Sequence, residues 1–295
     1  MNRVAATLLA IPALAALVAA AVYGASEWRL RDVEPAPAFA LPIPTDDAAI
    51  GRGRHLALTR GCTGCHGERL EGHDFGRHFA PVERAVAPNL AAHARAHDAA
   101  TLEAAIRQGI GADGRALWIM PSYNFARLTD EDVAALIAYL RSMPVIAAEL
   151  PVPSLGWAVR WQIATGQETH MADWVADVPP LRTDAVAEPA LARGEYLAMT
   201  TCNECHGLDL RGTVFPGDAT PDLAIGSAYP EADFRRLLRT GVGIGERTDL
   251  GLMSEVAKER FAHFTEEELT DLRGFLLTLA QQPVPPDVPW RRLAD

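Results

Sequence analysis

Cys62-Thr63-Gly64-Cys65-His66 and Cys202-Asn203-Glu204-Cys205-His206 are two copies of the pattern C-x-x-C-H, and together they hold all four cysteines of the chain. In a chain of this composition such a pattern is expected only about 0.002 times by chance. A zinc site or a redox disulfide would explain the cysteine pairs but would leave both histidines without a role. Structural disulfides are also a weaker interpretation, because paired C-x-x-C segments make a poor disulfide framework.

The C-x-x-C-H pattern is the attachment signature of c-type haem. Each thiol forms a thioether with one vinyl group, and the two intervening residues bring both sulfurs to one porphyrin edge. The adjacent histidine then coordinates the iron. The sequence therefore predicts two covalently bound haem c groups, one held by Cys62, Cys65 and the axial ligand His66, the other by Cys202, Cys205 and the axial ligand His206.

Both motifs lie inside a longer internal repeat. Arg52–Thr59 parallels Arg193–Thr200, and Met120 pairs with Met253 further along. Each copy opens with a predicted helix, at about 47–60 and 188–201, which carries a glycine suited to a close helix crossing, Gly53 or Gly194.

Each copy also ends in a helix with an apolar stripe, preceded by an N-cap signal at Thr129 or Thr265. Shorter helical patterns occupy 100–108 and 231–239, and strand signals are scarce. The expected fold class is therefore all-α, with two helical domains in tandem after an N-terminal transmembrane helix. The predicted segments are 1–25 (signal-anchor), 26–45 (linker), 46–145 (domain 1), 146–186 (interdomain segment), 187–283 (domain 2) and 284–295 (C-terminal tail).

Each unit resembles a class I cytochrome c domain in its order of opening helix, C-x-x-C-H, Pro-x-Leu, middle helix, methionine loop and capped final helix. The chain as a whole resembles membrane-associated dihaem cytochromes c, such as the cytochrome subunits attached to periplasmic dehydrogenases. The resemblance implies that Met120 and Met253 are the second axial ligands of the two irons. It also implies that the carbonyls of Pro88 and Pro221 accept hydrogen bonds from the two ligating histidines.

The two methionines differ in their context. Met120 is followed by Pro121, as the family pattern requires, whereas Met253 is followed by Ser254. His263 is the nearest substitute for Met253. His73 and His78 are the weaker substitutes for Met120.

The N-terminal segment from Val4 to Val22 contains no charged residue. Nineteen residues of helix span about 28 Å, roughly the hydrocarbon thickness of a bilayer. A cleaved signal peptide and an uncleaved signal-anchor both fit, and the length of the run and the bulky Tyr23 before Ala25 favour the anchor. Arg3 before the run places the rest of the chain on the periplasmic side of a bacterial cytoplasmic membrane.

The interdomain segment 146–186 is rich in proline and holds Trp157, Trp161 and Trp174. A free linker rarely carries three tryptophans. We expect a short helix near 155–163 and a brace between the two domains; a docking patch for a partner or for the bilayer interface is the alternative. Arg160 is expected on a solvated face, with a haem propionate as its alternative partner.

The net charge is −11, which argues against a nucleic-acid binder. It suits association with a basic docking surface on a redox donor or acceptor. The interpretation is an electron carrier, not an enzyme, that relays single electrons from a periplasmic dehydrogenase or cytochrome to a downstream oxidase or carrier. The alternatives are a dihaem enzyme such as a peroxidase, which needs an open axial position, and a haem-bearing membrane-anchor subunit of a dehydrogenase complex.

Overall fold

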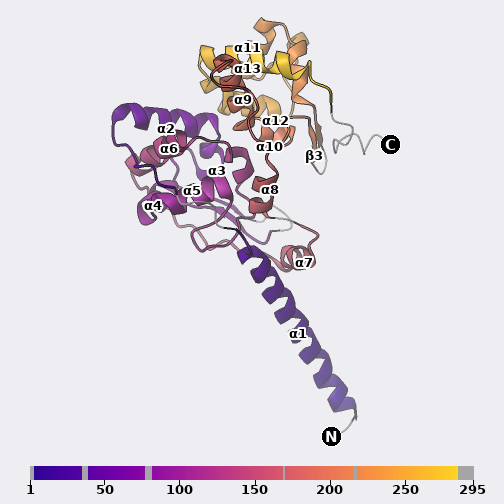
Figure 1. Ribbon diagram of the computed structural model, residues 1–295. Coiled ribbons are helices and arrows are strands. Elements are labelled where there is room, and N and C mark those ends of the chain that lie inside the picture. The colour runs from indigo at the N-terminus through magenta and orange to yellow at the C-terminus, as the bar shows by residue number, and fades with distance from the viewer. Residues whose placement is uncertain (1–2, 35–38, 77–81, 169, 216–217, 285–295) are drawn as a thin grey trace.

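One long helix, α1, extends away from two groups of helices, with the N-terminus at its far end (Figure 1). The computed structural model describes residues 3–34, 39–76, 82–168, 170–215 and 218–284. His78 and nearly all of the predicted C-terminal tail lie outside the described residues. The first unit comprises α2 to α6 (residues 47–142) and the second unit comprises α9 to α13 (residues 189–279).

The elements follow the chain in this order: α1 (Arg3–Arg31), α2 (Asp47–Thr59), α3 (Cys62–His66), β1 (His73–Gly76), β2 (Ala85–Ala87), α4 (Leu90–Ala96), α5 (Ala99–Glu103), η1 (Ala104–Gln108), η2 (Ser122–Phe125), α6 (Asp130–Ser142), α7 (Trp157–Thr165), α8 (Met171–Asp177), α9 (Pro189–Met199), α10 (Asn203–His206), β3 (Thr213–Phe215), β4 (Asp218–Thr220), η3 (Leu223–Ala228), α11 (Glu231–Thr240), η4 (Ile244–Glu246), α12 (Leu252–Glu259), η5 (Phe261–His263) and α13 (Glu266–Leu279).

In the first unit, α2 crosses α6 at Gly53. A Cβ at this glycine would overlap the carbonyl of Ala135, so the crossing requires a residue without a side chain. Helix α6 begins at the predicted cap, where Thr129 Oγ1 accepts from the Asp132 amide at 3.2 Å. The buried face of α6 then packs into an apolar core with α2 and α5, which includes Leu56, Leu102, Val133, Leu136, Ile137 and Leu140.

The second unit repeats this arrangement with α9 and α13. A Cβ at Gly194 would overlap the carbonyl of Asp271, so the predicted close crossing is present in both units. Thr265 and Glu268 form the predicted capping box at the start of α13. The core of this unit is a separate apolar cluster that includes Leu197, Met199, Phe234, Leu238, Phe261, Leu269, Leu272 and Leu276.

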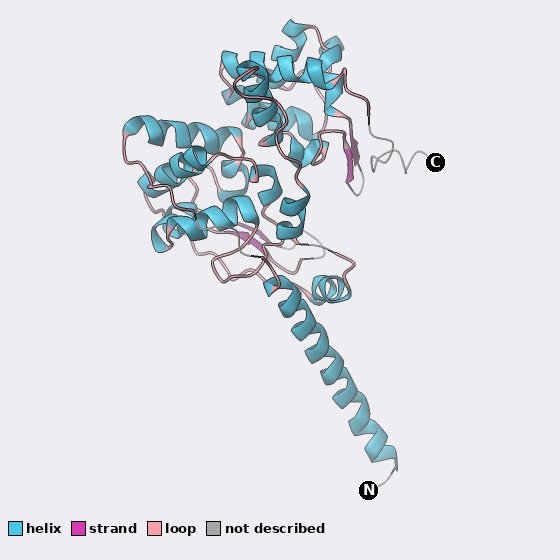
Figure 2. Ribbon diagram, in the orientation of Figure 1, coloured by secondary structure: helices cyan, strands magenta, loops and turns pink. Residues whose placement is uncertain are grey.

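Within the part of the chain that the structure describes, the strands form two short antiparallel hairpins, and each follows a C-x-x-C-H helix (Figure 2). His73 pairs with Ala87 in the β1–β2 hairpin, and Thr213 pairs with Thr220 in the β3–β4 hairpin. The chain is therefore mostly helical, as predicted, but not purely so. Each strand has only three or four residues, too short a stretch to produce a period-of-two signal in the sequence.

The two units meet through contacts that are exchanged between equivalent positions. His55 on α2 lies against Glu268 at the start of α13, and Tyr196 on α9 donates to Asp132 at the start of α6. His55 and Tyr196 occupy the same place in the repeat, as do Asp132 and Glu268. The two units are thus related by an approximate two-fold rotation, which places α3 and α10 near the contact between them.

Helix α8 fills the role of the predicted brace. The ring of its Trp174 lies 5.4 Å from the ring of Tyr123, between centroids, and Met171 and Val175 pack against the core of the second unit. The Arg127 guanidinium of the first unit donates to the carbonyl of Pro179 at 2.9 Å. Residues 171–179 therefore link the two units.

Helix α7 begins at Trp157, close to the expected start, and packs on α1. Val159 and Ile163 of α7 are buried with Leu30 of α1 in a third apolar cluster, together with Ala85 and Ala116 of the first unit. Within the described residues, Ala10–Arg31 is the one helical stretch long and apolar enough to cross a membrane. Helix α1 itself continues to Arg31, six residues past the predicted boundary at residue 25.

Candidate haem-binding sites

The two C-x-x-C-H segments adopt the same backbone conformation. Each forms a short helix, α3 or α10, that ends at a glycine with positive φ, Gly67 (84°) or Gly207 (86°). The carbonyl of the motif histidine then accepts from the amide of Gly72 or Gly212, at 2.7 Å in both copies. The sequence repeat therefore corresponds to a repeated local structure.

The loop after each motif also has the same backbone conformation in both units, and each loop contains one strained residue. Leu70 and Leu210 have φ values of 62° and 65°, a region that non-glycine residues rarely adopt. The carbonyl of each leucine accepts a hydrogen bond at 2.9 Å from the amide of the Pro-x-Leu leucine, Leu90 or Leu223. This bond brings the Pro-x-Leu segment beside the motif histidine.

Both motif histidines are oriented by the predicted proline carbonyl. His66 Nδ1 donates to the Pro88 carbonyl at 2.9 Å, and His206 Nδ1 donates to the Pro221 carbonyl at 2.8 Å. The bond places the proton on Nδ1 and leaves Nε2 with its lone pair. Burial lowers the pKa of each histidine, and the carbonyl bond only partly opposes this effect, so both rings are neutral near pH 7. A neutral imidazole with a free Nε2 is the form that binds iron.

None of the four cysteines forms a disulfide. Burial raises the pKa of Cys62 to about 11 and that of Cys202 to about 12, so both are protonated at neutral pH. Cys62 packs against the core of the first unit and Cys202 is part of the core of the second. Each motif therefore presents its first sulfur at the edge of an apolar interior.

Met120 and Met253 are each half-buried against the core of their own unit. Met120 lies on an irregular loop before η2, as expected for a ligand loop. Met253 is instead the second residue of α12, because the residues after Gly251 form a helix where the first unit has a loop. Met199 on α9 is buried in the core of the second unit.

Several other histidines have protein partners. His55 is bound to Glu268, and the rings of His73 and Phe75 lie 4.5 Å apart between centroids. His263, the substitute ligand considered for the second iron, lies on η5. Across the described parts of the chain, no three side chains of the types His, Cys, Asp and Glu are grouped to hold a metal ion.

The donor set fits haem better than zinc. Each motif offers two thiols and one oriented imidazole on a single turn of helix, with a thioether sulfur in the same unit. A tetrahedral zinc site needs four ligands around one point, and the described residues contain no such group. A porphyrin, by contrast, supplies four of the iron ligands itself and needs from the protein only the axial pair and the covalent tethers.

Two arginines, Arg60 and Arg260, lie between the two motifs in space, and no sequence pattern indicates this position. Arg60 is buried; its guanidinium donates to Thr59 Oγ1 at 2.9 Å and, across the contact between units, to Thr200 Oγ1 at 3.0 Å. Its Nε atom is buried without a hydrogen-bond partner. Burial lowers the pKa of Arg60, partly offset by the nearby Tyr196 and Glu268.

The second of these residues, Arg260, lies between α12 and η5. Its guanidinium covers Gly61, immediately before α3, and donates to Glu204 of α10 at 2.7 Å. Gly61 has a φ of 77°, and a side chain there would overlap the guanidinium. Arg260 therefore lies between the two C-x-x-C-H segments and connects them.

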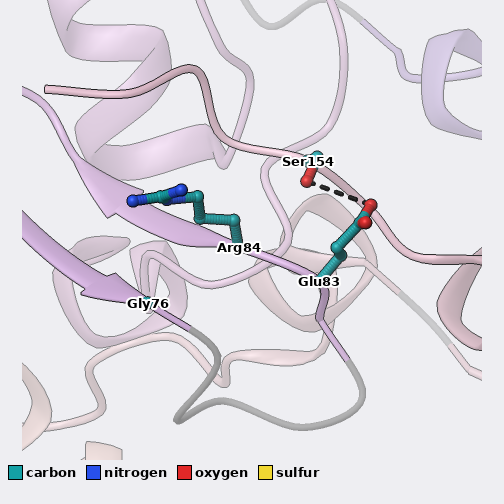
Figure 3. Close-up of a pocket in the computed structure, with 4 residues that line it drawn as sticks. All are labelled: Gly76, Glu83, Arg84 and Ser154. Carbon is teal, nitrogen blue, oxygen red and sulfur yellow. Dashed lines mark hydrogen bonds between the residues drawn. The ribbon is translucent and has the colours of Figure 1, made fainter.

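A separate pocket lies on the first unit beside the β1–β2 hairpin (Figure 3). It is lined by Gly76, Glu83, Arg84 and Ser154, and Ser154 Oγ donates to Glu83 Oε2 at 3.2 Å. Arg84 forms an ion pair with Asp74 at 2.6 Å. The lining contains no residue of the C-x-x-C-H motifs, so this pocket is not part of the candidate sites.

Comparison with known proteins agrees with this geometry. Residues 50–144 match the family model "Cytochrome c", so the first unit is a cytochrome c domain, a type of domain that binds haem c covalently. The chain is homologous to cytochrome c subunits of dehydrogenases. It is 26% identical to the alcohol dehydrogenase (quinone) cytochrome c subunit of Gluconobacter oxydans (strain 621H), over 81% of this chain and 56% of the relative.

Two further relatives are also cytochrome subunits of dehydrogenases. The chain is 24% identical to the gluconate 2-dehydrogenase cytochrome c subunit of Pantoea cypripedii, over 79% of this chain and 60% of the relative. It is 28% identical to the fructose dehydrogenase cytochrome subunit of Gluconobacter japonicus, over 84% of this chain and 55% of the relative. The chain thus spans little more than half the length of these relatives.

Proposed function

We propose that this chain is a dihaem c-type cytochrome that relays single electrons and is held at a bacterial cytoplasmic membrane by α1. The first haem is tethered by Cys62 and Cys65, and the second by Cys202 and Cys205. The haem-bearing domains, residues 46–145 and 187–283, face the periplasm. The observation that carries this proposal is the pair of histidine–proline hydrogen bonds, repeated at 2.9 and 2.8 Å after two C-x-x-C-H motifs.

The second domain has the weaker support from comparison, because the family model covers the first domain alone. Its local geometry supplies the argument instead. Gly207, Leu210 and Gly212 reproduce the backbone of Gly67, Leu70 and Gly72 within a few degrees of φ. Because a left-handed leucine is costly, its recurrence at the same place favours a shared requirement of both loops.

Each residue has a definite task in the proposed sites. Haem iron, when bound, supplies one-electron redox chemistry. His66 and His206 coordinate through Nε2, and their proline partners fix the plane of each ring. Met120 and Met253 would each supply a thioether sulfur to one iron, and such a ligand would raise the reduction potential relative to a second histidine. The apolar cores against which both methionines pack keep water away from that face.

The proposed electron donor is a dehydrogenase. The relatives are cytochrome subunits of alcohol, gluconate and fructose dehydrogenases. A haem-bearing subunit of such a complex is therefore the form of electron carrier that the comparisons favour. The net charge of −11 suits a basic docking surface on the donor or on the acceptor.

The test is a count of covalent haem. The full-length chain is produced with the bacterial haem-attachment machinery, extracted from membranes in detergent, denatured and weighed by mass spectrometry. We expect the mass of the polypeptide plus two haem groups. The paired variant Cys202→Ser with Cys205→Ser should carry one haem, as should Cys62→Ser with Cys65→Ser. A wild-type chain with a single haem would refute the second site, and a colourless chain would refute the whole proposal.

A further inference from the structure

Helix α7 is apolar on two opposite faces. Val159 and Ile163 are buried against α1 and the first unit. On the other side, Trp157 is 52% exposed and Trp161 is 43% exposed. These two tryptophans are one helical turn apart and form a single stripe with the exposed Ala158. Apolar side chains on two opposite faces of one helix are normally both covered, so the tryptophan face requires a partner.

The place of α7 is fixed by the end of α1. A buried stripe on α1, made of Val22, Ser26 and Leu30, packs on α7 and its surroundings. Arg160 of α7 reaches back to α1, where it donates to Ser26 Oγ and Glu27 Oε1, both at 3.0 Å. This ion pair replaces the solvated position or propionate contact considered for Arg160 from the sequence.

The same arginine also lies over the ring of Tyr23, 4.1 Å from its centroid. Helix α7 is therefore held at the point where α1 leaves the body of the protein. In Figure 1, α1 runs along the plane of the view while α7 is seen nearly end-on, so the two helices cross. Because α7 runs steeply across α1, it lies close to the plane of a membrane that α1 spans.

The height of α7 along α1 matches the end of the apolar segment. The run of apolar and small residues that begins at Val4 ends at Val22, before Tyr23, and the first charged residue after it is Glu27. Val22 is also the first buried residue of the stripe that packs on α7. From Val4 to Val22 the helix measures about 28 Å, one hydrocarbon thickness. Trp28, which is 64% exposed, and the exposed Tyr23 lie at the same level of α1 as α7.

We infer that α7 lies in the interfacial layer of the membrane that α1 spans, with Trp157 and Trp161 among the lipid headgroups. Tryptophan prefers this layer, because its ring is apolar while its indole N–H hydrogen bonds to water and headgroups. Arg29, an exposed cation beside Gly166 at the end of α7, adds attraction to lipid phosphate. The inference rests on the proposed role of α1 as a membrane anchor.

The contact would hold the first unit at a set distance and tilt above the bilayer. Helix α1 alone would leave the body free to swing about its emerging end. A second attachment through α7 removes that freedom. The first unit and its haem would then face any membrane-bound partner in one orientation.

Site-specific photocrosslinking tests this inference. The residue p-benzoylphenylalanine replaces one side chain at a time in the full-length chain, at Trp157, Trp161, Trp174 or Leu17. The protein is reconstituted in vesicles of phosphatidylethanolamine and phosphatidylglycerol and irradiated. Trp174 on α8 is the matched control, because its 41% exposure is close to the 43% of Trp161 while it lies on the brace between units. Leu17 on α1, 68% exposed, reports on the anchor itself.

We expect adducts of one phospholipid mass at Leu17, Trp157 and Trp161, and none at Trp174. Adducts at Leu17 without adducts at Trp157 and Trp161 would overturn the interfacial contact and leave the anchor intact. No adduct at Leu17 would overturn the anchor, and the interfacial contact with it. A crosslink from Trp157 or Trp161 to a polypeptide in native membranes would assign this face to a protein partner instead. Unchanged haem absorbance and circular dichroism identify the variants that are folded.

Discussion

The Nε2 atom of His55 lies 2.8 Å from Oε1 of Glu268, although the two residues are 213 positions apart in the chain. Glu268 also accepts from the amide of Thr265 at 2.8 Å, so one carboxylate closes the capping box of α13 and binds the other unit. The equivalent carboxylate of the first unit, Asp132, accepts from the hydroxyl of Tyr196. The contact between the units thus depends on the first turns of the two final helices.

The charge on Glu268 makes the free energy of unfolding depend on pH in the acidic range. Burial raises the pKa of this carboxyl, but the bonds from His55 and the Thr265 amide outweigh it, so the pKa lies below its usual value. A carboxyl with a lowered folded pKa stabilises the protein above its unfolded pKa, and the contribution is lost as the pH falls through the folded value. The free energy of unfolding should therefore decrease below about pH 4.5.

Glu268→Gln isolates this effect, because the amide oxygen can still accept from the cap. The variant should lose about 1 kcal/mol at pH 7 and show a shallower decline toward pH 3. Denaturant titrations of the detergent-solubilised protein at several pH values measure both the loss of unfolding free energy at pH 7 and its decline toward pH 3. Parallel acid profiles for the variant and the wild type would contradict the assignment.

The hydroxyl of Tyr196 is predicted to matter in the same way at the other half of the contact. It donates to Asp132 and accepts from the Thr129 amide at 3.3 Å. Tyr196→Phe should reduce the free energy of unfolding by about 1–2 kcal/mol, because a carboxylate oxygen and a helix N-cap lose a partner. Tyr229→Phe, in which a half-buried tyrosine outside this contact loses its hydroxyl, is the control and should change little. Equal losses of unfolding free energy in both variants would show that the hydrogen bonds of the Tyr196 hydroxyl are not the cause.

The helix crossings should tolerate no side chain. Gly53→Ala places a Cβ against the Ala135 carbonyl and should cost about 1–3 kcal/mol. Gly51→Ala in the same helix meets no atom within 4 Å and should instead stabilise by about 0.5–1 kcal/mol. Thermal unfolding of the two variants gives the comparison directly. A neutral Gly53→Ala would mean that α2 and α6 separate more easily than their packing implies.

The axial role of the methionines can be tested one at a time. Met120→Ala and Met253→Ala should each remove about half of the weak sulfur-to-iron absorption at the red edge of the oxidised spectrum, and lower the potential of one haem. Met143→Ala is the control, since Met143 packs against the same core as Met120 but ends a helix. If Met253→Ala leaves the band intact, His263→Ala is the next variant to examine, because His263 is the nearest alternative ligand.

Arg60 should influence both haems by its charge. The guanidinium is buried and acts electrostatically on Cys62 and on Cys202, so it lies close to a tether of each haem. A nearby buried positive charge disfavours the extra positive charge of oxidised iron, so Arg60→Met should lower both reduction potentials. Arg60→Lys, which keeps the charge, should retain most of the wild-type values. A redox titration followed by visible absorption separates these outcomes.

Local features of the fold could be predicted from the sequence, because each depends on neighbours in the chain. The caps at Thr129 and Thr265 follow from the threonine and the acidic residues beside it. The glycine crossings at Gly53 and Gly194 follow from their place in two equivalent helices. The proline carbonyls were predicted from the family resemblance, and both hydrogen bonds are present.

Features that join distant parts of the chain could not be predicted in this way. The bonds of Arg60 to Thr200 and of Arg260 to Glu204 cross between units or loops, and no period or motif marks them. The sequence does not predict the hairpins, because their strands are too short to show an alternation of apolar and polar residues. The family resemblance predicts Met253 on a loop, but the residues from Leu252 to Glu259 form a helix. Phe261 follows Met253 by eight positions, whereas Phe125 follows Met120 by five, so the second copy has room for this helix.

The exchange of equivalent contacts between the units has a consequence for how such a chain arose. Each unit carries both halves of a self-complementary surface, the position of His55 or Tyr196 and the first turn of the final helix. A surface of this kind joins two identical molecules as well as two halves of one polypeptide. Duplication and fusion of a self-associating ancestor would produce this arrangement. The interdomain segment, which includes α8, would then join covalently two units that had associated as separate molecules.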